Sequence, residues 1–316
     1  MTRQITIGTR ASPLALAQTE QIVAALQSAA GLPTDAIAVK KISTRGDEIL
    51  DRTLAEIGGK GLFTDELNAG LRDGSIDLAV HSLKDLPTAE VPGLHSAAIP
   101  SREDPRDILI MPSPDGPMPA TLADLPEGAC VGTASLRRKA QILQARPDLD
   151  IVPLRGNIGT RLAKLSPDAV AATVLAMAGL NRMGYAASDW QALPPDIMVP
   201  AAGQGALAVQ CRADDAALIA QIAVLDDADT RACVTAERSF LAGLDGSCRT
   251  PIAALALLDG ANAQTALLHG RMLAENGTEF VEDTCRFDLA DLDAAYAAGA
   301  QLADNLRARA PHLVTA

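Results

Sequence analysis

The chain has 316 residues, of which 48% are hydrophobic and 2% aromatic, and its formal net charge is −12. This length suffices for two or three domains that each bury a core. The negative charge and the scarcity of aromatic rings argue against a partner bound through nucleic-acid phosphates and stacked bases.

The first segment alternates strand and helix patterns. Residues 5–9 predict a strand, and a helix follows that begins at Ser12, a good N-cap, and ends at Gly31. A second strand is predicted over 37–42, so the three elements form a βαβ unit with a parallel sheet. Arg10 lies at the carboxyl edge of that sheet, where open α/β sheets bind ligands.

The polar stretch 43–61 ends in a glycine-rich segment, 58–61. Two interpretations stay open for it. One is a mobile lid with glycine hinges, and the other is an ordinary long loop.

An amphipathic helix over 63–71 leads into a buried strand over 76–80. Ser82, Lys84 and Asp85 come directly after this strand. They fit a ligand site at the carboxyl edge of the sheet, and they equally fit a helix cap (Ser82) with a surface ion pair between Lys84 and Asp85.

A crossing between domains is predicted over 99–107, and the proline-rich stretch 111–119 is predicted to be a loop. A second unit begins at Cys130 and repeats the first pattern of strand, Gly-Thr, serine and helix. Further strands are predicted over 151–154 and 169–174, with a helix carrying Arg161 and Lys164 between them.

Prolines between 193 and 200 mark a return crossing, after which the segment at 203–207 rejoins the first lobe. From about 226 the chain is acidic and alanine-rich. This last region is predicted to hold a helix over 229–241, strands over 252–258 and 265–273, and a closing helix over 291–307.

The predicted fold class is therefore α/β, with two lobes around a central cleft and a small α+β C-terminal domain. The first lobe comprises 1–101 and 200–222, the second comprises 102–199, and the C-terminal domain comprises 223–316.

Charge is distributed unevenly along the chain. Residues 213–316 carry a net charge of −9, whereas 131–165 carry seven bases against two acids. This basic island favours an anionic small ligand over a solvated helix face. Its Arg137-Arg138 step follows a strand end and is expected to be unpaired.

Five cysteines, odd in number and without C-x-x-C spacing, predict neither a zinc site nor a disulfide framework, and the histidines show no metal-ligand spacing. Cys248 lies in a polar, glycine-containing turn beside Arg249, which favours an accessible thiolate, although a packing role stays open. The N-terminus lacks a signal-peptide pattern, and the longest apolar run, 169–180, is too short to span a bilayer, so a cytoplasmic protein is expected.

Eight motifs in order resemble the hydroxymethylbilane synthase (porphobilinogen deaminase) family. They are GTRASPLAL (8–16), GGKGLFT (58–64), VHSLKDLP (80–87), REDPRD (102–107), VGTASLRR (131–138), LRGNIGTR (154–161), GQGA (203–206) and GSCRTP (246–251). The resemblance implies two lobes like those of a periplasmic binding protein and a third domain that carries the cofactor.

The resemblance also implies a transferase of tetrapyrrole and heme biosynthesis. It would join four porphobilinogens head to tail, release ammonia and build hydroxymethylbilane on a dipyrromethane primer held by a cysteine thioether. By position, Cys248 would be that cysteine and Asp85 the catalytic carboxylate. A cytoplasmic monomer without a metal, nucleic-acid or membrane partner is implied.

The resemblance assigns the remaining site residues by position, and the division between cofactor and substrate stays open among the basic ones. The cofactor's side chains would be held by Ser82, Lys84, Thr133, Ser135, Arg137, Arg138 and Arg161. The incoming ring would be held by Arg10, Ser12, Arg155 and Phe63, and Lys60 would belong to the lid. A rival interpretation is a non-catalytic anion-binding protein with two lobes, because fold alone does not settle function.

Overall fold

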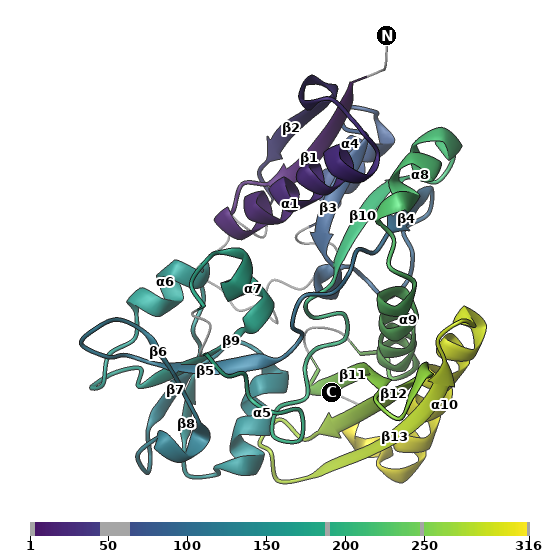
Figure 1. The fold of residues 1–316 in the computed structure, drawn as a ribbon. Coiled ribbons are helices and arrows are strands. Elements are labelled where there is room, and N and C mark those ends of the chain that lie inside the picture. Colours follow the sequence, from purple (N-terminus) through teal and green to yellow (C-terminus); the bar gives the residue numbers. More distant parts are fainter. Residues whose placement is uncertain (1–3, 45–63, 187–189, 247–249, 315–316) are drawn as a thin grey trace.

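Three sheets organise the chain in the computed structural model, which describes residues 4–44, 64–186, 190–246 and 250–314 (Figure 1). The first and second sheets have five strands each, in the orders β2-β1-β3-β10-β4 and β6-β5-β9-β7-β8. The third sheet, β11-β12-β13, belongs to the C-terminal region. The predicted fold class, two α/β lobes and a small α+β domain, is confirmed.

The first lobe begins with the predicted βαβ unit. Strand β1 (Ile5–Arg10) runs parallel to β2 (Ile37–Ile42), and α1 (Pro13–Ala29) connects them. The Ser12 side chain accepts a hydrogen bond from the Ala15 amide, so the predicted N-cap is confirmed. Apolar α1 side chains such as Ile22 and Leu26 pack on β1 and on β3.

The rest of the first lobe comes from two separate segments. Helix α4 (Asp65–Arg72) precedes β3 (Leu78–Ser82), which is parallel to β1 and is followed by the 3-10 turn η2 (Leu83–Asp85). Strand β10 lies between β3 and β4 and is antiparallel to both, as the predicted return crossing requires. The remaining elements are η1 (Thr34–Ala36), β4 (Leu94–Ala98), β10 (Leu207–Arg212), α8 (Ala216–Ile222) and η4 (Ala223–Leu225).

The second lobe has the same strand arrangement as the first. Strand β7 is parallel to β8 and β9, and β5 is antiparallel to β9 and β6. Its elements are β5 (Asp107–Met111), β6 (Met118–Ala120), η3 (Leu122–Asp124), β7 (Cys130–Gly132), α5 (Leu136–Ala145), β8 (Asp150–Val152), α6 (Ile158–Ala163), β9 (Ala172–Ala176) and α7 (Met177–Arg182).

The correspondence between the lobes explains the short repeat in the sequence. Strand β7 and helix α5 occupy the places that β1 and α1 occupy in the first lobe, and Ser135 caps α5 as Ser12 caps α1. In each sheet the middle strand, β3 or β9, has one antiparallel neighbour, β10 or β5. The chain enters this antiparallel strand from a crossing that comes from the other lobe. The loop predicted over 111–119 is wrong at both ends. Met111 is the last residue of β5, and Met118 and Pro119 lie in β6, an edge strand that tolerates proline.

Two crossings join the lobes and lie against one another. The Glu103 amide of the first crossing donates to the Gly205 carbonyl of the second, at 3.3 Å. Gly205 has a φ of +88°, and a Cβ there would collide with the Glu103 carbonyl oxygen, so the contact requires glycine.

The C-terminal domain packs two helices on one face of its sheet. Phe240 of α9 and Leu302 of α10 are buried against β12 residues such as Leu268. Its elements are α9 (Ala228–Gly243), β11 (Ile252–Asp259), β12 (Asn262–Leu273), β13 (Phe280–Asp288), α10 (Leu292–Arg309) and η5 (Pro311–Leu313). In Figure 1 the first lobe lies at the top, the second at the lower left and this domain at the lower right. Within the described ranges, no helix combines the length and the apolar character needed to cross a membrane.

Candidate active site

Parallel strands bring the predicted site residues of the first lobe to one edge. Strands β1 and β3 end at the same side of the sheet, with Arg10 and Ser82 as their last residues. Asp85 closes η2 directly beyond β3 and is exposed. A carboxylate and a guanidinium group are thus presented at the edge where α/β sheets bind ligands.

The interpretation of this stretch as a cap with a surface ion pair is wrong. The Ser82 side chain makes no capping bond to η2, and its Oγ accepts a hydrogen bond from Gln18 Nε2 at 2.9 Å. Lys84 donates from Nζ to Gln204 Oε1 at 3.3 Å, so its ammonium is held by the return crossing and not by Asp85.

The ammonium of Lys84 is half-buried among other cations. Burial and then repulsion from Arg138 lower the pKa of Lys84, Asp85 and Asp107 oppose both effects, and the result is a pKa of about 8. A lysine in this state accepts an anionic partner readily, because the partner's charge would restore its usual pKa.

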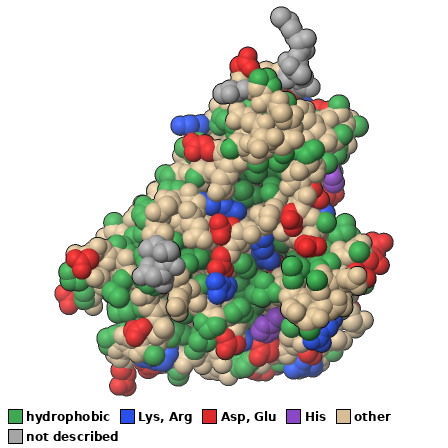
Figure 2. Space-filling view, viewed as in Figure 1, with side chains coloured by type: hydrophobic (Ala, Val, Ile, Leu, Met, Phe, Trp, Pro, Cys, Tyr) green, Lys and Arg blue, Asp and Glu red, His purple; other side chains and the backbone are tan. Residues whose placement is uncertain are grey.

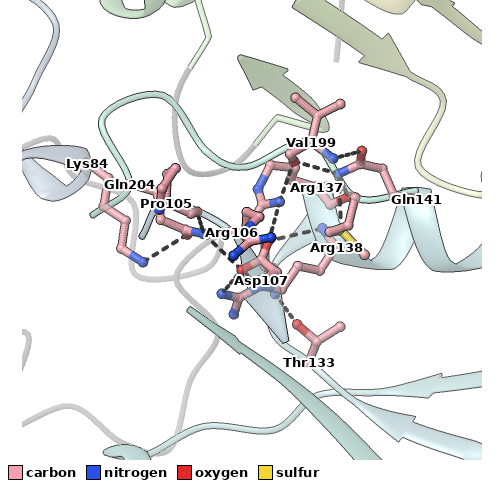
Figure 3. A network of polar contacts seen from close by, with 12 residues as sticks. Lys84, Pro105, Arg106, Asp107, Thr133, Arg137, Arg138, Gln141, Val199 and Gln204 are labelled. Atoms are coloured by element: carbon pink, nitrogen blue, oxygen red, sulfur yellow. Dashed lines mark hydrogen bonds and ion pairs between the residues drawn. The ribbon is translucent and has the colours of Figure 1, made fainter. Parts of the chain in front are cut away.

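A buried carboxylate that the sequence did not indicate holds the Arg-Arg step (Figure 3). Asp107 Oδ2 accepts from Arg137 Nη1 at 2.8 Å, and Asp107 Oδ1 accepts from Arg138 Nη2 at 2.7 Å. Asp107 is fully buried, and the two arginines are 5% and 6% exposed. The expectation that the step is unpaired is therefore wrong.

Gln204 extends this network to the first lobe. Its Nε2 donates to Asp107 Oδ1 at 2.9 Å and to the Pro105 carbonyl at 2.7 Å, while its Oε1 accepts from Lys84. Burial alone would raise the pKa of Asp107, but the charges and hydrogen bonds of Arg137 and Arg138 hold it far below its usual range. Gln204 and Asp107 stand in two of the quoted motifs, and their pairing could not be predicted because it depends on how the crossings pack.

Two further arginines of the second lobe face this cluster. Arg161 is half-buried, and its Nε donates to the Gly156 carbonyl at 2.7 Å. Burial, followed by repulsion from Arg138 and Arg155, lowers the pKa of Arg161 to about 10, although Asp85 opposes these effects. Arg155 Nη1 is buried and has no hydrogen-bond partner among the residues that the structure describes.

The hydroxyl groups at the start of α5 have local partners. Thr133 Oγ1 accepts from the Ser135 amide at 3.2 Å, and Ser135 Oγ accepts from the Arg138 amide at 3.4 Å. These bonds fix the turn from β7 into α5 and therefore the direction in which Arg138 leaves the helix. Each hydroxyl keeps its proton for donation to a ligand.

The proposed attachment cysteine, Cys248, lies outside the described residues, as do Phe63 and Lys60. The other four cysteines are free thiols. Burial raises the pKa of Cys211 to about 11 and that of Cys233 to about 12, and the pKa values of Cys130 and Cys285 are also raised by burial. These four thiols are poor sources of thiolate, as packing residues are.

The donor set fits a ligand that carries several carboxylates. The pKa values of Lys84 and Arg161 are lowered by burial and by neighbouring arginines, and Arg155 has a buried Nη1 without a hydrogen-bond partner. The buried carboxylate of Asp107 is already shared by two arginines. Figure 2 shows charged side chains gathered at the centre of the view, below the first lobe and between the other two domains. The acetate and propionate groups of a dipyrromethane match this excess of positive charge. Within the described part of the chain, no three His, Cys, Asp or Glu side chains form a group that could hold a metal ion.

Comparison with known proteins gives matches over nearly the whole chain. Residues 5–220 match the family model "Porphobilinogen deaminase, dipyromethane cofactor binding domain", and residues 231–308 match "Porphobilinogen deaminase, C-terminal domain". Porphobilinogen deaminase of Paracoccus denitrificans is 47% identical over 97% of this chain and 95% of its own length. That of Roseiflexus castenholzii is 49% identical over 88% of each chain.

Among solved structures, the extracellular-binding protein ytmK of Bacillus subtilis, a probable amino-acid ABC transporter component, is similar with a TM-score of 0.40. The identity is 11%, over 70% of this chain and 89% of that one.

Proposed function

The chain belongs to the porphobilinogen deaminase family, and from this premise we propose which of its residues carry out the reaction. The enzyme makes hydroxymethylbilane from porphobilinogen in tetrapyrrole biosynthesis, and its cofactor is a dipyrromethane. This catalytic function replaces the rival interpretation of an anion-binding protein without activity.

Asp85 is proposed as the catalytic carboxylate. Loss of ammonia from an aminomethylpyrrole leaves a cationic azafulvene, and a carboxylate beside the pyrrole N–H stabilises that charge. Asp85 also accepts and returns protons as the amine leaves and the coupled ring loses its α-hydrogen. The observation that carries the proposal is its position, exposed at the end of η2 and within range of the Arg161 charge on the opposite lobe.

The basic residues are proposed to bind carboxylates of the cofactor and the incoming ring. When bound, the dipyrromethane supplies the nucleophilic pyrrole carbon to which the first substrate methylene is joined. We assign the cofactor's side chains to Ser82, Lys84, Thr133, Ser135, Arg137, Arg138 and Arg161. The incoming ring is assigned to Arg10, Ser12, Arg155 and Phe63, with Lys60 in the lid.

Arg137 differs from the other members of this set. Its Nη1 is bonded to Asp107 and to the Val199 carbonyl, at 2.8 and 2.7 Å. Arg138 is bonded to Asp107 as well, but its charge acts more strongly on Lys84 and Arg161 than that of Arg137 does. We therefore propose that both arginines help to hold the cofactor and that Arg138 contacts it more directly. The domain boundaries are proposed as 1–101 with 200–222, 102–199 and 223–316, and the working form as a cytoplasmic monomer.

Cys248 is proposed as the attachment residue, and intact mass spectrometry tests it. The purified protein should exceed its sequence mass by two porphobilinogens less two ammonias. Replacement of Cys248 by Ser should remove this excess, whereas replacement of Cys211 or Cys233 by Ser should leave it. An unmodified mass in active protein would disprove attachment at Cys248.

Asp85 is tested separately, in protein whose mass shows it to be loaded. Asp85→Ala should abolish turnover, and Asp85→Glu should keep a low rate, because a displacement of one methylene can cost roughly 100-fold. A loaded Asp85→Ala variant that works at the wild-type rate would remove Asp85 from the mechanism and leave the attachment result unaffected.

A further inference from the structure

An arginine of the C-terminal domain brackets the segment that carries Asp85. Arg238, on α9, donates from Nη1 to the carbonyls of Leu83 and Leu86, both at 3.3 Å. Its Nη2 donates to the carbonyls of Pro87 and Thr88, at 2.5 and 3.3 Å. Four backbone carbonyls on both sides of Asp85 are therefore held by one side chain.

Arginine suits this task because of its shape. A guanidinium group presents five N–H donors in a rigid plane, whereas a lysine ammonium presents three from a single point. Burial lowers the pKa of Arg238, and Glu90 opposes this through its charge. The hydrogen bonds of the group go to backbone carbonyls, so Arg238 fixes backbone geometry instead of pairing with a carboxylate.

The helix that carries Arg238 is itself fixed to the centre of the molecule. The preceding residue, Glu237, is fully buried and accepts from Arg102 Nη1 at 2.6 Å and from the Gly203 amide at 2.7 Å. These two residues belong to the two crossings between the lobes. Glu237 also accepts from the Ala256 amide of β11 at 2.8 Å, so α9 is a rigid support for Arg238.

We propose that Arg238 is a positioning residue that sets the Asp85 segment against the C-terminal domain. The same helix ends at Gly243, five residues before Cys248 in the chain. One element therefore links the proposed catalytic carboxylate to the domain of the proposed attachment cysteine. The inference rests on the proposed role of Asp85.

Helix α9 offers a matched control two turns earlier. Arg231 also donates to backbone carbonyls of the first lobe, those of Ser96 and Ala97 at 3.4 and 3.5 Å, and it pairs with Asp226 at 2.6 Å. The carbonyl groups that accept from Arg231 belong to β4 and not to the Asp85 segment. Replacing either arginine would therefore weaken the contact between the C-terminal domain and the first lobe. Only replacement of Arg238 would also affect the position of Asp85.

The experiment compares Arg238→Lys and Arg238→Gln with Arg231→Lys. Cofactor content is measured by intact mass, amide hydrogen exchange over residues 83–90 by peptide mass spectrometry, and kcat and KM on the loaded fraction. For both Arg238 variants we expect faster exchange over 83–90 and a kcat lowered roughly 10- to 100-fold at nearly unchanged KM, because small misplacements of catalytic groups have effects of this size. Arg231→Lys should keep the wild-type kcat even where its melting temperature falls.

Two results would overturn the inference. One is wild-type kcat and wild-type exchange over 83–90 in the Arg238 variants, and the other is an equal loss of kcat in Arg231→Lys. Failure of the proposed function gives a different pattern, in which Asp85→Ala stays active while the exchange rates over 83–90 still respond to Arg238.

Discussion

Replacing Asp107 by Asn should strongly destabilise the enzyme. Asp107 is fully buried and accepts hydrogen bonds from Arg137, Arg138 and Gln204. Asparagine keeps the shape but leaves two buried guanidinium groups without a counter-charge and points an NH₂ group at N–H donors. Removal of one partner from a buried ion pair costs about 3–5 kcal/mol, which is a large share of the roughly 5–15 kcal/mol that stabilises a folded protein.

Thermal unfolding measures this effect. At roughly 2–4 °C per kcal/mol for a chain of this size class, the melting temperature should fall by roughly 6–20 °C. The control is Asp148→Asn, which breaks a pair with Arg146 that is partly exposed on both sides, and it should shift the melting temperature far less. A variant Asp107→Asn that melts within about 3 °C of the wild type would refute the reasoning.

The pH dependence of stability gives a second readout on Asp107. The folded-state pKa of Asp107 lies well below the value of about 3.9 for an unfolded chain. Its contribution is therefore complete above that unfolded value and is lost as the pH falls through the folded one. Unfolding measured between pH 5 and pH 2 should lose stability more steeply in the wild type than in Asp107→Asn.

Two further predictions concern Lys84 and the crossings. In cofactor-free Cys248→Ser protein, the folded-state pKa of about 8 for Lys84 predicts that its ammonium stays charged below pH 8 and becomes reactive above it. Acylation followed by peptide mass spectrometry should show this, and reactivity that rises only near the ordinary pKa of about 10.4 would contradict it. Gly205→Ala should lower the melting temperature, because the new Cβ would collide with the Glu103 carbonyl oxygen and the φ of +88° is strained for alanine. Gly116→Ala is the control in the same unfolding scans, because a Cβ there meets open space while the φ of +112° is also positive. The difference between the two variants therefore measures the collision separately from the backbone strain.

Local signals in the sequence predicted the first βαβ unit. The unit is marked by a cap at Ser12, a proline after it and two β-branched strands. Its observed bounds differ from the prediction by at most two residues, and those of β2 do not differ. Strand β13 was missed because Phe280–Asp288 is an edge strand with exposed polar side chains on much of its length and no clean alternation. Helix α8 was missed because its seven residues give too short a pattern to detect.

The sequence predicted which residues belong to the site, but not which of them contact one another. The motifs indicated which residues follow strand ends, and parallel pairing then places Arg10 and Ser82 at one edge. The partners of Arg137 and Arg138 could not be predicted, because Asp107 lies 30 positions away at the start of β5. That strand enters the second sheet from the crossing, so the contact follows from topology and not from any local pattern.

The basic island divides into arginines that hold the fold together and arginines that remain for a ligand. Arg146 is satisfied by Asp148 and by the Leu122 carbonyl, at 2.7 and 2.6 Å, and so belongs to the first group. Arg155 and Arg161 belong to the second, because Arg155 has a buried Nη1 without a hydrogen-bond partner and the pKa of Arg161 is lowered by burial and by repulsion from neighbouring arginines.

Folding and ligand binding are therefore coupled through charge. A single carboxylate, Asp107, compensates two arginines, and Lys84 stands beside them with a lowered pKa. The folded protein without an anion thus carries repulsion that the unfolded chain relieves. Carboxylates that contact this cluster only in the folded state remove the repulsion, and a group that interacts only with the folded state raises the free energy of unfolding. The arrangement that recognises an anionic cofactor is consequently one that the cofactor stabilises.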